Sequence, residues 1–341
     1  MLFDFSVWGS SILAIKALVT SSAWAGLPLL AKAAASLAYW NVAGFFMWCI
    51  FVVGHDCGHT TFSNYKWVNN ILGHVTHASL LVPFFPWALS HRRHHMYHNH
   101  VDKDYSYKWY TPEKLNAKTE TLARKLHDSK PSMFMYPFVA WQLYVLGIDD
   151  GSHLIPFANQ RLWKETPAVE KRKCWISFAS VVASAAGIFA LNGFDVKNFL
   201  FYYGGPHVMF SWWLFCVTYL QHHGPQTLVY GDKNWDYVKA GFETVDHTFG
   251  KVIDHLHHHI TDGHVVHHLF FTKIPHYNLM KATAALRKYL VDNKVESVYR
   301  YEDTRDFPVR LHKYMVTTGF HAVEAVAPEP VVVAPAEPVL A

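Results

Sequence analysis

The sequence predicts an all-α integral membrane protein with about four transmembrane helices, arranged as two hairpins below a helical cytosolic cap. The first observation is composition: of the 341 residues, 51% are hydrophobic and only 16% are charged, whereas about 25% are charged in a typical soluble domain. The second is a set of four apolar runs, each close to the ~20 residues that cross a bilayer as a helix. They lie at about residues 7–31, 37–54, 174–194 and 199–221.

Short connections join these runs in pairs. Residues 31–36, AKAAAS, link the first two runs, and residues 193–198, GFDVKN, link the last two. Each hairpin returns the chain to the side from which it started, so the polar segments share one face of the membrane. These segments carry an excess of Lys and Arg, which indicates the cytosolic face. We therefore expect both termini in the cytosol.

The apolar segment 70–90 is expected to lie at the membrane surface or to re-enter from it, with a break near Pro83 and Pro86. A crossing here would separate two histidine-rich segments that we expect to share a metal site. Residues 133–147 are aromatic and short, which indicates a further interfacial helix.

The C-terminal part is expected to be cytosolic, with a helix at 275–293. Residues 1–325 form a single domain in this interpretation. The Pro/Ala/Val-biased residues 326–341 have the composition of a disordered tail.

The third observation is a set of three histidine boxes, HDCGH, HRRHH and HVVHH, at 55–59, 91–95 and 264–268. In a helix, residues three and four apart lie on one face, so each box presents its imidazoles together. One metal ion needs about four ligands, so eight histidines indicate two metals. The candidate ligands are His55, His59, His91, His94, His95, His264, His267 and His268.

The residue types near the boxes indicate which metal they bind. A zinc hydrolase of the H-E-x-x-H kind needs a Glu where this chain has Asp56. Carboxylate-bridged di-iron proteins use Glu and Glu-x-x-His pairs, which the boxes lack. An all-imidazole dinuclear iron centre that reacts with oxygen remains. Acidic residues near the boxes are candidates to orient the ligating rings: Asp56, Asp102, Asp104, Asp246 and Asp262.

Other functions find little support. The formal charge of +4 and the lack of a Gly-rich phosphate loop argue against a nucleic-acid partner. The four cysteines show no paired spacing, so we expect reduced, buried thiols.

Longer stretches around the boxes carry a family resemblance. HDCGHTTFS, SHRRHH, and ITDGHVVHHLF followed by IPHY resemble the membrane fatty acid desaturases, and TYLQHHGP and TVDHTFG resemble the methyl-end branch, the Δ12 (ω6) and ω3 acyl-lipid desaturases. The resemblance implies two iron ions (Fe2+/Fe3+) on the boxed histidines and O2 as co-substrate. It implies electrons from a separate cytochrome b5 with its reductase, or from ferredoxin, an acyl-lipid substrate, and the endoplasmic reticulum membrane.

The resemblance also extends the list of candidate site residues. His222 and His258 match positions shared by the branch, and each is a possible additional metal ligand or supporting group, as are Asp56 and Asp262. Four other histidines near the boxes are expected to pack or to support ligands: His74, His77, His98 and His100.

The expected reaction is insertion of a cis double bond toward the methyl end of an unsaturated C18–C20 acyl chain. The runs at 98–104 and 262–277 resemble ω3 (Δ15-type) members more than Δ12 members. A Δ12 desaturase acting on oleoyl chains and a hydroxylase or acetylenase of the same family remain as alternatives. A membrane zinc hydrolase and a metal-transport protein are more distant ones.

Overall fold

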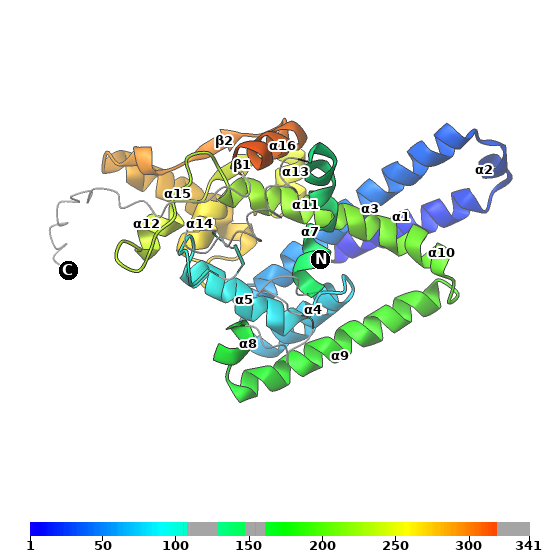
Figure 1. Cartoon of the computed structure of the whole chain (residues 1–341), viewed down its shortest axis with the longest axis horizontal. Helices are drawn as coiled ribbons and strands as arrows, with labels where there is room; N and C mark the ends of the chain where they lie inside the picture. Colours follow the sequence, from blue (N-terminus) through cyan, green and yellow to red (C-terminus); the bar gives the residue numbers. More distant parts are fainter. Residues whose placement is uncertain (105, 108, 110–128, 147–153, 155–160, 319–341) are drawn as a thin grey trace.

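The computed structural model describes residues 1–104, 106–107, 109, 129–146, 154 and 161–318. These residues are mostly helical, as predicted. Two long helical pairs extend toward the same end of the molecule, where α2 and α10 make the turns, while α12, α14 and α15 lie at the opposite end (Figure 1). The predicted disordered tail, 326–341, lies outside the described residues.

The first hairpin consists of α1 (Leu2–Val19), α2 (Ser22–Gly26) and α3 (Leu29–His59). Its turn lies at 20–28, so the prediction of a linker at 31–36 is wrong. That alanine-rich stretch is a strong helix former and continues α3. The turn forms where Ser21 accepts a hydrogen bond from the Trp24 N–H and where Pro28 precedes the first residue of α3.

The helix α3 is longer than the hydrocarbon core of a bilayer is thick. Its 31 residues extend about 46 Å at 1.5 Å per residue, whereas the hydrocarbon core is about 30 Å thick. The helix starts with exposed apolar residues, Leu29 at 83% and Leu30 at 82%, as expected for contact with lipid. From Ala43 to Cys57 the helix is buried in protein.

The second hairpin consists of α9 (Ala168–Leu191), α10 (Val196–Phe199), a π-helical turn η1 (Leu200–Gly204) and α11 (Gly205–His222). The chain turns at Gly193, where φ is +71°, a conformation that glycine adopts without strain. Within the described residues, α1, α3 and α9 are long and apolar enough to cross a membrane. The fourth predicted run is helical from 196 to 222 but is divided by the π turn.

The apolar segment between the first two boxes folds as α4 (Lys66–Ala78) and α5 (Phe84–Met96). The break predicted near Pro83 is confirmed, because Pro83 is extended and directly precedes α5. Pro86 lies inside the first turn of α5 and does not interrupt it, since an N–H in the first turn has no intrahelical partner in any case. The two helices pack against α3 and α9.

Shorter helices build the cap around the boxes. The helices predicted at 133–147 and 275–293 are confirmed as α7 (Lys130–Leu146) and α15 (Leu279–Asp292). The other short elements are α8 (Arg161–Glu165), α12 (Tyr237–Gly241), α13 (Lys251–Leu256), α14 (His264–Leu269), η2 (His276–Asn278), η3 (Glu296–Val298) and α16 (Phe307–Thr318).

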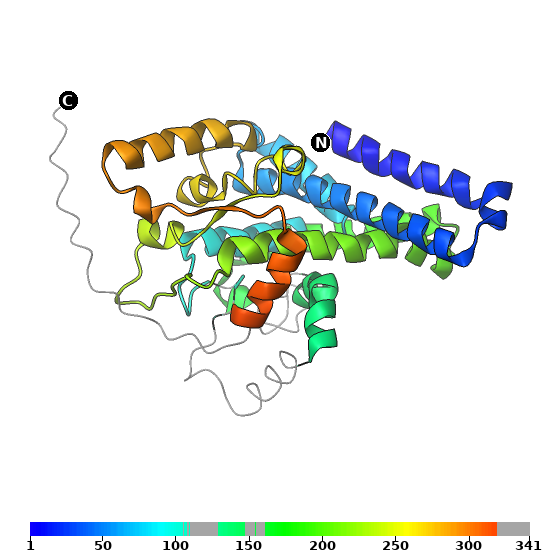
Figure 2. The ribbon, with the colours of Figure 1, turned by 90° about the horizontal axis from the view of Figure 1, so that it is seen from above.

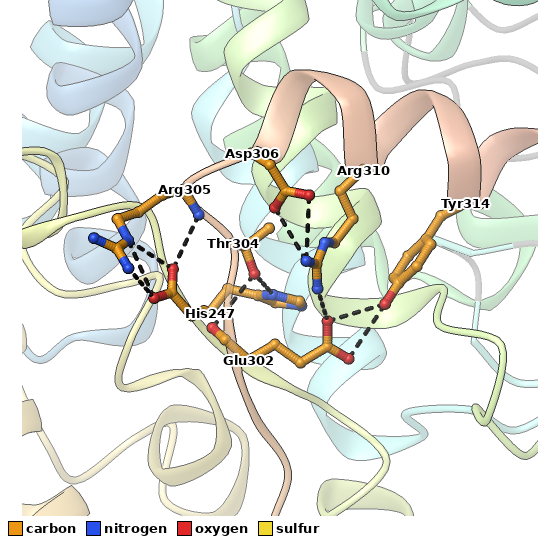
Figure 3. A network of polar contacts seen from close by, with 8 residues as sticks. His247, Glu302, Thr304, Arg305, Asp306, Arg310 and Tyr314 are labelled. Atoms are coloured by element: carbon orange, nitrogen blue, oxygen red, sulfur yellow. Dashed lines mark hydrogen bonds and ion pairs between the residues drawn. The ribbon is translucent and has the colours of Figure 1, made fainter.

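The all-α prediction missed one small sheet. Strands β1 (Asp246–Thr248) and β2 (Tyr301–Asp303) pair in parallel, with Asp246 opposite Tyr301. Polar contacts join this sheet to α16 (Figure 3). Glu302 accepts hydrogen bonds from Arg310 at 2.9 Å and from the Tyr314 hydroxyl at 2.9 Å. In Figure 2, α16 lies across the end of α11 and beside α7, and it packs against both helices. This packing fixes the strand that carries Asp246.

Candidate metal centre

Three elements bring the boxed histidines together. The first box is the last turn of α3, the second forms the C-terminal half of α5, and the third is most of α14. Seven of the eight side chains are buried, and His91 is partly buried. Because the cap covers all three elements, histidines that are more than 200 residues apart in sequence lie in contact.

The first group of histidines combines all three boxes. Its members each offer one ring nitrogen, and these nitrogens lie within 4.8 Å of one another. Nε2 of His95 is 3.1 Å from Nε2 of both His91 and His267. Nitrogens bound about 2.1 Å from one metal ion lie about 3.0–3.4 Å apart. The group is His55, His59, His91, His95 and His267.

The second group includes two histidines from outside the boxes. It contains His94, His98, His222 and His268. His264 lies beside it, with Nε2 3.1 Å from Nε2 of His222. The sequence predicts a packing or supporting role for His98, whereas the structure places it among the grouped nitrogens. The sequence signal for this position is the spacing of four residues from His94, which places the two side chains on the same face of a helical turn.

Two other candidates lie outside both groups. His258 is 3.4 Å from the carboxylate of Asp4, and its ring contacts that of His276. Asp262 accepts a hydrogen bond from His259 Nδ1 at 3.1 Å. Neither residue is a member of the two histidine groups.

The other histidines near the boxes also lie outside both groups. His74 is held by Asn70 and Ser177, and His100 donates to Asp232. The His77 ring packs on Phe51 and Trp87.

Burial keeps several of the grouped imidazoles neutral. Desolvation, followed by the field of the neighbouring histidines, holds the pKa of His95 and His268 well below the ordinary value. The pKa values of His264 and His267 are lowered by the same causes. A neutral imidazole has a free nitrogen lone pair, which is the form that binds a metal ion.

The second group also contains nitrogens that protein atoms do not satisfy. Among the described residues, Nε2 of His94 and both ring nitrogens of His98 and His268 are buried without a hydrogen-bond partner. Buried polar atoms are almost always paired, because an unpaired one costs about 1–3 kcal/mol. A cation at this position would satisfy one nitrogen of each ring, so the residues fit a metal ion.

Three carboxylates contact grouped imidazoles or the helix that carries them. Asp104 accepts a hydrogen bond from His94 Nδ1 at 2.9 Å, and Asp56 lies 3.4 Å from His55 Nδ1. Asp246 accepts from the backbone N–H of Val265 at 2.8 Å and so holds the start of α14. Burial raises the pKa of Asp246 to about 6. Asp102, a further candidate, donates its backbone N–H to Nδ1 of His100.

Aromatic side chains cover the first group. Trp87 stacks on His91 at 4.7 Å between ring centroids, and Phe271 stacks on His95 at 4.7 Å. The stacked rings limit the orientations of the imidazoles and exclude water from them. They also provide the apolar surroundings that a hydrocarbon chain near the centre needs.

Comparison with known proteins agrees with this geometry. The fatty acid desaturase family model matches residues 32–301, a range that includes all three boxes and both histidine groups. The chain belongs to the fatty acid desaturase family. It is 38% identical over 269 residues to a Delta(12) fatty acid desaturase of Caenorhabditis elegans, covering 77% of this chain and 68% of that protein.

Plant relatives place this desaturase in the methyl-end branch. It is 38% identical over 258 residues to a chloroplastic omega-3 fatty acid desaturase of Glycine max, covering 73% of this chain and 53% of that protein. It is 37% identical over 260 residues to the acyl-lipid omega-3 desaturase (cytochrome b5) of the Arabidopsis thaliana endoplasmic reticulum, covering 74% and 64%. The chain thus spans between about half and two thirds of the length of these relatives.

Proposed function

We propose that this protein is an O2-dependent acyl-lipid desaturase that inserts a cis double bond toward the methyl end of an unsaturated C18–C20 chain. The observation that carries the proposal is the pair of adjacent, buried, all-imidazole groups in a chain of the desaturase family. Each group has the nitrogen spacing of a ligand set. The ω3 position is preferred to Δ12, because the runs around the second and third boxes resemble ω3 members.

Two iron ions are the proposed cofactor. Five histidines would hold the first ion: His55, His59, His91, His95 and His267. The second would be held by His94, His98, His222 and His268, with His264 beside them. When bound, the irons would supply the chemistry by which O2, two electrons and two protons remove one hydrogen from each of two adjacent methylenes and yield two waters.

The protein's own residues position the ligands and the substrate. Asp104 keeps the Nδ1 proton of His94, so that Nε2 faces the second group. Trp87 and Phe271 exclude water from the first group. Adjacent methylenes of an acyl chain are chemically alike, so the carbon that reacts is selected by the position in which the protein holds the chain.

The membrane arrangement is part of the proposal. Four spans, α1, α3, α9 and the run from α10 to α11, would place the boxes and both termini in the cytosol. The excess of Lys and Arg in the box-bearing segments supports this orientation. Residence in the endoplasmic reticulum and electrons from a separate cytochrome b5 are supported by the name of the Arabidopsis relative; ferredoxin, named for a chloroplastic relative, is the alternative donor.

A lipid analysis tests the proposal. The chain is expressed in a host that makes only monounsaturated acids, with and without fed linoleate, and new double bonds are located by mass spectrometry. A trienoic acid formed only from fed linoleate supports the ω3 assignment, and linoleate formed from oleate replaces it with Δ12. A hydroxy or acetylenic acid shows the rival oxygenase. If wild type gives no new lipid and the purified protein holds zinc, the desaturase proposal is wrong.

A matched pair of variants tests the centre in the same host. His94→Ala is expected to abolish the product while the protein remains in the membrane, whereas His312→Ala, on the exposed surface of α16, keeps it. Product from His94→Ala at the wild-type level would contradict the ligand assignment.

A further inference from the structure

His98 is the one member of the second histidine group that lies outside a helix. It follows Met96, the last residue of α5, by two positions and lies in a turn. The next residue, Asn99, has a φ of +53°, a left-handed conformation that asparagine adopts more readily than most residues. Because the hydrogen bonds of a regular helix do not hold this turn, contacts with other segments must fix where the His98 ring lies.

The loop 228–235, between α11 and α12, supplies these contacts. Trp235 donates from Nε1 to the His98 carbonyl at 2.8 Å. The Asn99 carbonyl accepts from the Tyr230 N–H at 2.9 Å, and its side-chain amide donates to a carbonyl of the same loop at 2.9 Å. The turn that carries His98 is therefore bonded to the loop through both its backbone and a side chain.

The buried side chain of Glu243, which is 6% exposed, holds this loop from its other side. One carboxylate oxygen accepts from the Leu228 N–H at 3.0 Å, and the other accepts from the Tyr230 hydroxyl at 2.5 Å. Arg300, which directly precedes β2, forms an ion pair with the first oxygen. A buried carboxylate is stable only when it is paired and hydrogen-bonded, so these three partners fix Glu243, and Glu243 fixes the loop.

The short segment 243–246 also holds the elements that carry two other members of the second group. The Val245 N–H donates at 3.1 Å to the carbonyl of the residue before His222, at the end of α11. Asp246 accepts from the backbone at the start of α14, the helix that carries His268. Three of the four grouped histidines are therefore held relative to one another by this one segment.

We propose that Glu243 is a positioning residue for the second metal ion: through the loop 228–235, it holds His98 where the ring can bind that ion. The inference rests on the proposed two-ion centre, to which it adds a residue that controls the affinity for one ion. The members of the first group lie on α3, α5 and α14, and none of them lies in the turn that the loop holds. Loss of the Glu243 contacts is therefore expected to weaken binding of the second ion selectively.

Metal titration of the full chain in detergent tests this assignment without relying on activity. Co2+ is added to the metal-free protein, and binding is followed by visible absorption and by elemental analysis, which together give the number of ions and the Kd of each. Wild type is expected to bind two ions. Glu243→Gln keeps the size of the side chain but removes its charge and one acceptor oxygen. It is expected to raise the Kd of the second ion about 10- to 100-fold, the usual effect of losing a contact that orients a ligand, and to leave the first Kd unchanged.

Glu302→Gln is the matched control. The Glu302 carboxylate also accepts from an arginine and from a tyrosine hydroxyl, but these belong to α16, as Arg310 and Tyr314. This variant is expected to bind both ions with the wild-type affinities, whatever its thermal unfolding midpoint.

A second variant guards against misfolding of Glu243→Gln. Trp235→Phe removes the Nε1 donor to the His98 carbonyl and leaves the buried ion pair intact. It is expected to weaken the second ion as well, by a smaller factor. Unfolding midpoints of the same samples show which variants are folded, and if Glu243→Gln is unfolded, Trp235→Phe alone decides.

A double variant separates positioning of His98 from a general loss of stability. In His98→Ala, the ligand through which Glu243 acts is absent, so adding Glu243→Gln should not weaken the second ion further. A further loss in the double variant, equal weakening of both ions, or wild-type affinity for the second ion in the folded single variants would overturn the assignment. Failure of the proposed centre is distinguishable, because wild type itself would then bind fewer than two ions.

Discussion

His276 donates two hydrogen bonds to one carboxylate oxygen of Asp56, from its backbone N–H at 3.1 Å and from its Nδ1 at 2.7 Å. Asp56 belongs to the first box, and His276 follows the third. The other carboxylate oxygen lies 3.4 Å from Nδ1 of His55. Asp56 therefore connects a grouped imidazole to the segment that leads from α14 to α15.

Replacing His276 by Ala is expected to weaken the first histidine group. Asp56 would remain buried with fewer partners, and His55 would lose its fixed orientation. Loss of such a supporting contact typically lowers metal affinity about 10- to 100-fold. Metal bound per chain, measured by elemental analysis at limiting free metal, checks the prediction. His312→Ala, at an exposed position, is the control; equal metal binding by the two variants would refute the role of His276.

His98 and His100 provide a matched test of the second group. His98 lies among the grouped nitrogens, whereas His100 lies outside them and bonds to Asp232. His98→Ala is expected to lower bound metal from two ions per chain toward one and to remove desaturation. His100→Ala is expected to keep both ions. Two ions in His98→Ala would exclude this residue from the ligand set.

Gly54 allows α3 and α4 to approach each other. A Cβ at this position would lie 2.2 Å from Nδ1 of His77 and 2.3 Å from Oγ1 of Thr76. Gly54→Ala is therefore expected to lower the free energy of unfolding by about 1–3 kcal/mol, the usual cost of overpacking. Gly187 in α9 has nothing within 4 Å of its Cβ position, so Gly187→Ala should be neutral or stabilising.

Thermal unfolding midpoints in the same detergent compare the two glycine variants. A midpoint for Gly54→Ala at or above that of Gly187→Ala would show that the two helices can separate without cost.

His247 is held in one tautomer by two partners, of which Figure 3 shows Thr304. Its Nε2 lies 2.8 Å from the Leu220 carbonyl, to which it donates, and its Nδ1 accepts from the Thr304 hydroxyl at 2.6 Å. Burial lowers the pKa of His247 to about 4, so the ring is neutral. Thr304→Val would leave Nδ1 buried and unpaired, and is expected to cost about 1–3 kcal/mol of unfolding free energy.

Thr317→Val is the control for this prediction, because the Thr317 hydroxyl donates to the Lys313 carbonyl on an exposed turn of α16. Its unfolding midpoint should stay near that of wild type. Equal midpoints for the two valine variants would mean that the bond from Thr304 to His247 contributes nothing to stability.

Local spacing explains why the boxes were predictable and their grouping was not. His94 and His95 are adjacent in sequence, yet they belong to different groups. Successive side chains on a helix point about 100° apart, so adjacent histidines reach different groups. Which group each joins depends on where α14 and α11 supply the remaining nitrogens, and that is a tertiary relationship.

The apolar helices, the three boxes and the desaturase family were predictable from the amino-acid sequence, because apolar runs and short histidine spacings are local patterns. It misplaced the first turn, since hydropathy does not distinguish an alanine-rich helix at 31–36 from a linker. The three-dimensional fold was needed to place His98 in the second histidine group, to place His258 outside both groups and to pair β1 with β2. Each of these depends on contacts between distant segments, which burial of the cap around α3 and α11 brings together.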